Sequence, residues 1–150
     1  MKRGPGFALL RALLVSFAVL PLVPAAVANH APLEALARPL EASYAFQCER
    51  DPLRTFHGFS VCARCYGIYF GLALGALLLR PRIDPFTQRV WLAVAALVLL
   101  LDVSSEALGM RPAWAPLRFL TGALLGYPVS LGLLLRLAPN HRATSAVAGR

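Results

Sequence analysis

Four long apolar stretches, separated by short polar and proline-containing segments, dominate the hydropathy pattern of this chain. They cover residues 7–28, 59–79, 90–108 and 117–137. A helix that crosses a bilayer needs about 20 mostly apolar residues, so each stretch is long enough to span a membrane. The last three stretches are joined by short connections of roughly ten residues, which favour antiparallel neighbours in a bundle. The pattern therefore predicts an all-α integral membrane bundle of four helices.

The first stretch has two interpretations. Residues 1–28 form either the first transmembrane helix or a secretory signal peptide, because a basic start, a short apolar core and the small residues that end at Ala28 also fit a cleaved signal. Cleavage after Ala28 leaves three helices. In both cases residues 29–150 form a single membrane domain, which consists of an outer cysteine-containing loop (29–58) and three transmembrane helices.

Composition agrees with a membrane protein. Hydrophobic residues make up 58% of the chain, above the ~45–50% of ordinary soluble domains. The net charge of +8 raises the question of nucleic acid binding, but the basic residues fall in small groups between apolar stretches instead of on one face. The predicted partner is therefore the lipid bilayer and not nucleic acid, and no protein partner is indicated.

The positive charges predict the orientation, because short cytoplasmic loops accumulate lysine and arginine. Nine of the 15 basic residues fall before the first stretch or within its start, between the second and third, or after the fourth: Lys2, Arg3, Arg11, Arg80, Arg82, Arg89, Arg136, Arg142 and Arg150. We therefore expect a multi-pass protein of the bacterial cytoplasmic (inner) membrane with both termini cytoplasmic. The cysteine-containing region then faces outward.

This orientation brings polar residues of three spans to one depth near the outer face. They are Arg64 in the second span, Asp102 and Glu106 in the third, and Arg118 in the fourth. Unpaired charges inside a membrane are costly, so these residues should form ion pairs, with Arg64 and Asp102 as the first expected pair. Such pairs can serve only to hold the helices in register, and this structural interpretation stays open.

Three cysteines accompany the charged residues. Cys62 and Cys65 lie three residues apart at a helix start, and Cys48 can approach them from the loop. A tetrahedral zinc site takes four ligands, and Glu49, His57 or the aspartate of the third span could add the fourth. The sequence thus predicts a zinc-like metal site formed by Cys48, Cys62 and Cys65 with Glu49 or His57.

Thiol redox chemistry is the alternative to metal binding. Cys62 and Cys65 form a CxxC step, which occurs in both metal and redox sites, and Cys48 could act as the resolving thiol. A single inert disulfide, or a purely structural subunit, is the third possibility. No catalytic residue is assigned, because the chain has no nucleotide-binding loop, serine-type elbow or HExxH step. Metal binding without catalysis is the favoured function.

The cysteine region resembles a known family. The matching residues are Cys48, Pro52, Arg54, Thr55, Phe56, Gly58, Val61-Cys62-Ala63-Arg64-Cys65-Tyr66-Gly67-Ile68-Tyr69, Gly71, Asp102, Arg118, Thr121, Gly122 and Gly126. This pattern is similar to that of uncharacterised prokaryotic membrane proteins, the domain-of-unknown-function family 2085. The resemblance implies a membrane location and no specific activity. The chain departs from the family pattern at Glu49, Arg50 and Glu106, where the family has His, Gln and Gln.

Overall fold

The computed structural model describes residues 5–27, 35, 38–39, 42–44, 61–78 and 84–137. The helices in these residues are α1 (Pro5–Val19), α2 (Leu22–Val27), α4 (Ala63–Leu77), α5 (Pro85–Ala107) and α6 (Ala115–Leu137). The described part of the chain contains no β-strand, so the predicted all-α class is confirmed there.

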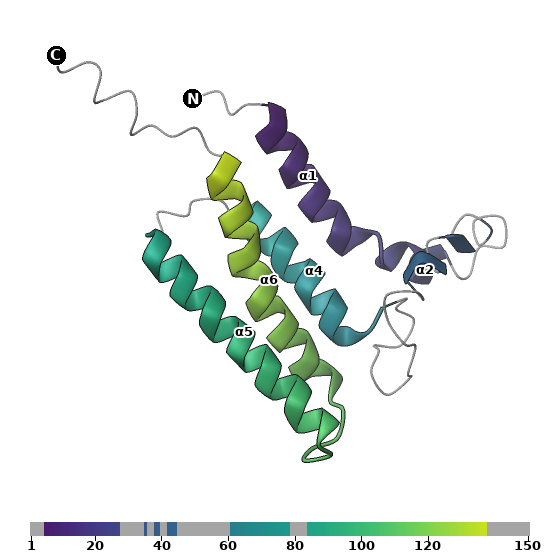
Figure 1. The fold of residues 1–150 in the computed structure, drawn as a ribbon. Helices are drawn as coiled ribbons and strands as arrows, with labels where there is room; N and C mark the ends of the chain where they lie inside the picture. The colour runs from purple at the N-terminus through teal and green to yellow at the C-terminus, as the bar shows by residue number, and fades with distance from the viewer. Residues whose placement is uncertain are drawn as a thin grey trace.

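The helices are arranged around a central pair (Figure 1). Helices α4 and α6 lie side by side and make the most extensive contact among the described helices. Helix α1 packs mainly on α4, whereas α5 packs on α6. The first turns of α1 and α5 and the last turn of α6 lie at one end of the molecule. The turn between α5 and α6 lies at the opposite end, and α4 begins toward that end.

Glycines allow α4 and α6 to pack closely. Gly67 and Gly71 face backbone atoms of α6, while Gly122 and Gly126 face backbone atoms of α4. A Cβ atom added at any of these positions would overlap with the backbone of the other helix. Small residues spaced four apart are typical of close helix contacts in membranes. This contact fixes the register of α4 against α6.

The first apolar stretch does not form one continuous helix. Helix α1 ends at Val19 and α2 begins at Leu22, with a turn between them. Pro21 lies in that turn, and proline has no N–H group to continue the hydrogen bonds of a helix. The proline therefore divides the stretch that the hydropathy pattern treated as one span.

Helix α5 begins five residues before the predicted span. Asp84 caps it, because its Oδ2 accepts hydrogen bonds from the backbone N–H groups of Phe86 (2.9 Å) and Thr87 (3.3 Å). Pro85 follows at the first helical position, where the missing N–H group costs nothing. The extra residues bring α5 to 23 residues.

Two of the described helices, residues 85–107 and 115–136, are long and apolar enough to cross a membrane. Helices α1 and α4 are apolar but have 15 residues each.

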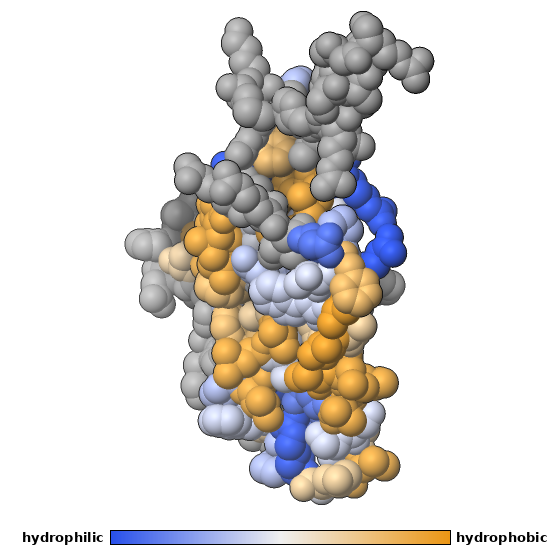
Figure 2. All heavy atoms as spheres, turned by 90° about the vertical axis from the view of Figure 1, so that its left-hand side faces the viewer, coloured by the Kyte–Doolittle hydropathy of each residue, from blue (hydrophilic) through white to orange (hydrophobic). Residues whose placement is uncertain are grey.

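On α5 only Ala95 and Asp102 are buried. Figure 2 looks onto the α5 side and shows large hydrophobic patches, with a strongly hydrophilic patch near the lower end. The apolar helices match the predicted stretches, and a four-helix membrane bundle stays a prediction.

Candidate functional site

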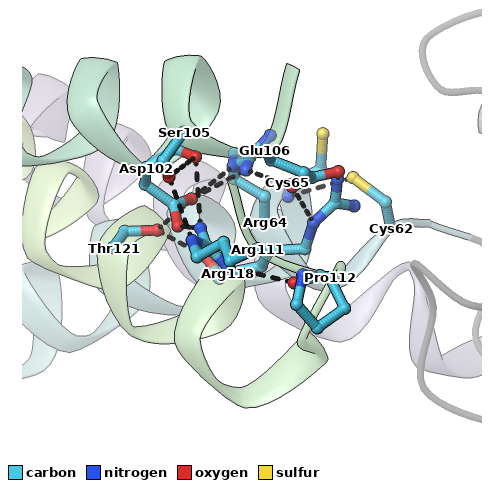
Figure 3. A network of polar contacts seen from close by, with 10 residues as sticks. All are labelled: Cys62, Arg64, Cys65, Asp102, Ser105, Glu106, Arg111, Pro112, Arg118 and Thr121. Carbon is cyan, nitrogen blue, oxygen red and sulfur yellow. Dashed lines mark hydrogen bonds and ion pairs between the residues drawn. The ribbon is translucent and has the colours of Figure 1, made fainter. Parts of the chain in front are cut away.

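The turn between α5 and α6 lies beside a compact group of charged side chains, which we name the arginine–acid cluster. Its members are Arg64, Asp102, Glu106, Arg111 and Arg118 (Figure 3). They come from the first turn of α4, the last turns of α5, the α5–α6 turn and the first turn of α6. The structure thus brings together the four charged residues singled out in the sequence and adds a fifth.

Asp102 is the most enclosed acid of the cluster, with a side chain that is 3% exposed. Its Oδ2 accepts hydrogen bonds from Arg64 Nη2 (2.7 Å) and Nε (3.2 Å), and lies 3.1 Å from the Thr121 hydroxyl oxygen. Arg111 forms an ion pair with Oδ1 and donates a hydrogen bond to the Asp102 backbone carbonyl (3.1 Å). Both carboxylate oxygens therefore face guanidinium groups.

Glu106 lies one helical turn after Asp102 and shares one of its partners. Arg118 Nε donates to Glu106 Oε2 at 2.7 Å, and Arg118 Nη2 contacts the other carboxylate oxygen. Arg64 Nη2 also donates to Glu106 Oε2, at 3.2 Å. Arg64 therefore bridges the two acids and ties α4 to α5, while Arg118 ties α6 to α5.

Arg111 is the cluster member that the sequence reasoning missed. Gly109 follows the end of α5 and has a φ of 70°. Its N–H group donates to the Glu106 carbonyl (3.0 Å), and the Met110 N–H group donates to the Ser105 carbonyl (2.9 Å). This pair of bonds is the Schellman motif, which reverses the chain after a helix. The reversal returns Arg111 to α5, where its Nε donates to Ser105 Oγ at 3.0 Å. A glycine two residues before an arginine was the signal available in the sequence.

The charges of the cluster do not balance. Within the described residues, three arginines face two carboxylates, which leaves one net positive charge. The Arg118 side chain is only 3% exposed and that of Asp102 is also 3% exposed, so the cluster is partly removed from water. Removing one partner of such a group is costly, because an uncompensated charge remains buried.

The two thiols of the CxxC step lie beside this positive group (Figure 3). Cys62 is the N-cap of α4, and its Sγ accepts a hydrogen bond from the Cys65 N–H group at 3.5 Å. Cys62 is 7% exposed and Cys65 is partly exposed. The two residues do not form a disulfide with each other. Both thiols thus lie at a helix N-terminus, and Arg64 of the cluster lies between them in the sequence.

The other predicted ligands, Cys48, Glu49 and His57, lie outside the described residues. Within the part of the chain that the structure describes, no three side chains of His, Cys, Asp or Glu converge as a metal site would require. The metal site and the redox pair both stay predictions.

Two of the described helices are long and apolar enough to cross a membrane, and the arginine–acid cluster lies where they are joined. The family described as "Predicted membrane protein (DUF2085)" matches residues 48–131, more than half of the chain, and this chain belongs to that family. The resemblance found in the sequence is thereby confirmed.

A curated relative is an uncharacterised protein of Methanocaldococcus jannaschii, 32% identical over 103 residues. The match covers 63% of this chain and 66% of the relative, slightly under two thirds of its length. That relative is archaeal, so the bacterial origin inferred for this chain stays a prediction. No solved structure matches the chain.

Proposed function

We propose that this protein is a multi-pass membrane protein that holds a zinc-like metal ion at Cys62 and Cys65. In this proposal both termini lie in the cytoplasm, and the metal lies on the extracytoplasmic face of the inner membrane. The observation that carries the proposal is the placement of both thiols at the start of α4, beside the arginine–acid cluster.

The electrostatic surroundings support metal binding. The Cys65 N–H group points at Cys62 Sγ, the N-terminus of α4 carries a partial positive charge, and the cluster adds a net positive charge. All three factors stabilise thiolates, the form in which cysteine binds zinc. Cys48 and either Glu49 or His57 would complete a tetrahedral set. With His57 as the fourth ligand the zinc site carries one net negative charge, which the excess arginine of the cluster offsets; with Glu49 it carries two, of which the arginine offsets one.

Exposure favours metal binding over redox chemistry. Reactive thiols lie in electropositive and partly exposed surroundings. Cys65 meets both conditions, whereas Cys62, at 7% exposure, is poorly placed for attack by another thiol. A cysteine that binds a metal ion does not need to be accessible to another thiol. A membrane thiol oxidoreductase that uses Cys65 is therefore the second candidate.

Metal analysis of the purified full-length protein tests the proposal. We expect stoichiometric zinc in the wild type and loss of most of it in Cys48→Ser, Cys62→Ser and Cys65→Ser, because zinc sites lose affinity when a thiolate is removed. Asp84→Asn is the matched control, since Asp84 caps the far end of α5 and should leave the metal content unchanged.

Two other results would overturn metal binding. Negligible metal together with one reducible disulfide among the three cysteines would favour the oxidoreductase. Negligible metal without a disulfide would leave a structural membrane subunit, whose charged cluster only holds the helices together. If the wild type does hold zinc, comparing Glu49→Gln with His57→Ala identifies the fourth ligand, because the true ligand causes the larger loss of zinc.

A further inference from the structure

A groove of about 630 Å³ runs between α5 and α6 at the end of the molecule opposite the arginine–acid cluster. Its apolar lining includes Leu92 of α5 and Val129 and Leu133 of α6. Binding sites for small ligands are commonly about 300–1,000 Å³ in volume, so the groove is large enough to hold part of a ligand. It shares no residue with the thiol site.

Two arginines flank this groove, one from each helix. Arg89 and Arg136 both line it, and both are exposed. Neither forms an ion pair with an acid in the described part of the chain. Asp84, the described acid nearest in sequence, uses its Oδ2 to cap α5. The mouth of the groove is therefore cationic.

A glycine and a glutamine shape the floor of the groove. Gln88 Nε2 donates a hydrogen bond to the Pro128 carbonyl at 3.3 Å, and its side chain occupies the space that a Cβ atom on Gly132 would need. Gln88 thus adds a polar group to the lining of the groove. A larger residue at position 132 would push into this space.

The arginines also lie at the right depth for a lipid headgroup. Helix α5 has 23 residues, about 34 Å at 1.5 Å per residue, compared with a hydrocarbon core of about 30 Å. Arg89 lies in its second turn and Arg136 in the last turn of α6, so both guanidinium groups can reach the membrane–water interface.

The geometry points to a binding site for one anionic phospholipid in this groove. The headgroup phosphate lies between Arg89 and Arg136, and Gln88 donates a hydrogen bond to it or to the glycerol ester. One acyl chain follows the apolar lining at Leu92 and Leu133. Arginine pairs well with phosphate, and basic pockets between transmembrane helices suit acidic headgroups. The site does not depend on the proposed metal.

Native mass spectrometry and thermal unfolding of the full-length protein in neutral detergent test this site. We expect phosphatidylglycerol to bind and to raise the melting temperature, while phosphatidylcholine and inorganic phosphate do neither. Arg89→Gln/Arg136→Gln should weaken phosphatidylglycerol binding about thirtyfold, the factor expected for two arginines at an anionic surface. Arg38→Gln, which removes an exposed charge away from the groove, should keep wild-type binding.

A second variant tests the groove separately from its charge. Gly132→Leu places a large side chain in the groove lining and should also weaken phosphatidylglycerol binding, because it takes up space that the acyl chain would use. The Cβ atom that it adds meets the flexible end of the Gln88 side chain, which can move aside. Equal binding by the double arginine variant and the wild type would overturn the site, and so would an equal loss in Arg38→Gln. A melting shift with inorganic phosphate alone would replace the lipid by a free anion. Zinc content should stay unchanged in all these variants, which separates this test from that of the thiol site.

Discussion

At the scale of single residues, Arg64 is the central member of the charged cluster. Its guanidinium group donates to both Asp102 and Glu106, so one side chain neutralises part of two acids on consecutive turns of α5. It also lies between the two cysteines in sequence, at the start of α4. A change at Arg64 should therefore affect both helix packing and the thiols.

Arg64→Ala should destabilise the protein by about 3 kcal/mol, the lower end of the cost of breaking a buried ion pair. The lower end applies because Asp102 keeps Arg111 and Glu106 keeps Arg118. Thermal unfolding in detergent measures the effect. Arg38→Ala removes the same charge from an exposed position and should destabilise the protein less than Arg64→Ala does. Equal melting temperatures for the two variants would contradict the role given to Arg64.

At the scale of the elements, the contact between α4 and α6 decides how the site is assembled. Gly71 faces the backbone at Ala123 and Tyr127, and Gly122 faces the backbone at Arg64. The close approach places the first turn of α4, with Arg64, next to the first turns of α6, with Arg118. The separate packing of α5 on α6 places Thr121 near Asp102 Oδ2.

Gly71→Ala should therefore destabilise the protein by about 1–3 kcal/mol, the usual cost of overpacking a tight contact, because the new Cβ atom meets backbone that cannot move alone. Gly6→Ala is the matched control, since Gly6 is also helical but has no atom of another element within 4 Å of an added Cβ. That control should be neutral or slightly stabilising, as alanine favours helices. Melting temperatures in detergent compare the two, and a neutral Gly71→Ala would refute the close contact.

At the scale of the whole molecule, the two ends of the helical assembly differ in chemistry. One end carries the thiols and the enclosed ion pairs, whereas the other carries exposed arginines on α5 and α6. Positively charged residues accumulate on the cytoplasmic side of membrane proteins. The exposed-arginine end should therefore face the cytoplasm.

A reporter enzyme that is active only in the cytoplasm should therefore be active when it is fused after Arg150. A cysteine introduced at Pro39, in a variant without the native cysteines, should react with a membrane-impermeant thiol reagent in intact cells. Labelling at an introduced Phe86→Cys, in the first turn of α5, should require permeabilised cells. A periplasmic reporter, or the reverse labelling pattern, would invert the proposed orientation.

Local patterns in the sequence were sufficient to predict the helical class, the approximate helix positions and the family. Hydropathy and the cysteine-containing motif are properties of residues close in the sequence, so no partner helix is needed to recognise them. Capping signals are local as well, and Asp84-Pro85 explains in retrospect why α5 begins before the apolar stretch. The ion pairing of Arg64 with Asp102 was also expected, since unpaired charges in a membrane are costly.

Only the tertiary structure determined which side chains meet. The inclusion of Arg111 depends on the chain reversal at Gly109, and the sharing of Arg64 between Asp102 and Glu106 depends on the register of α4 against α5 and α6. The groove between Arg89 and Arg136 likewise exists only because residues 47 positions apart come together at one end of two helices. Sequence periodicity defines the face of each helix, but the pairing of faces is set by close packing between helices that are distant in the chain.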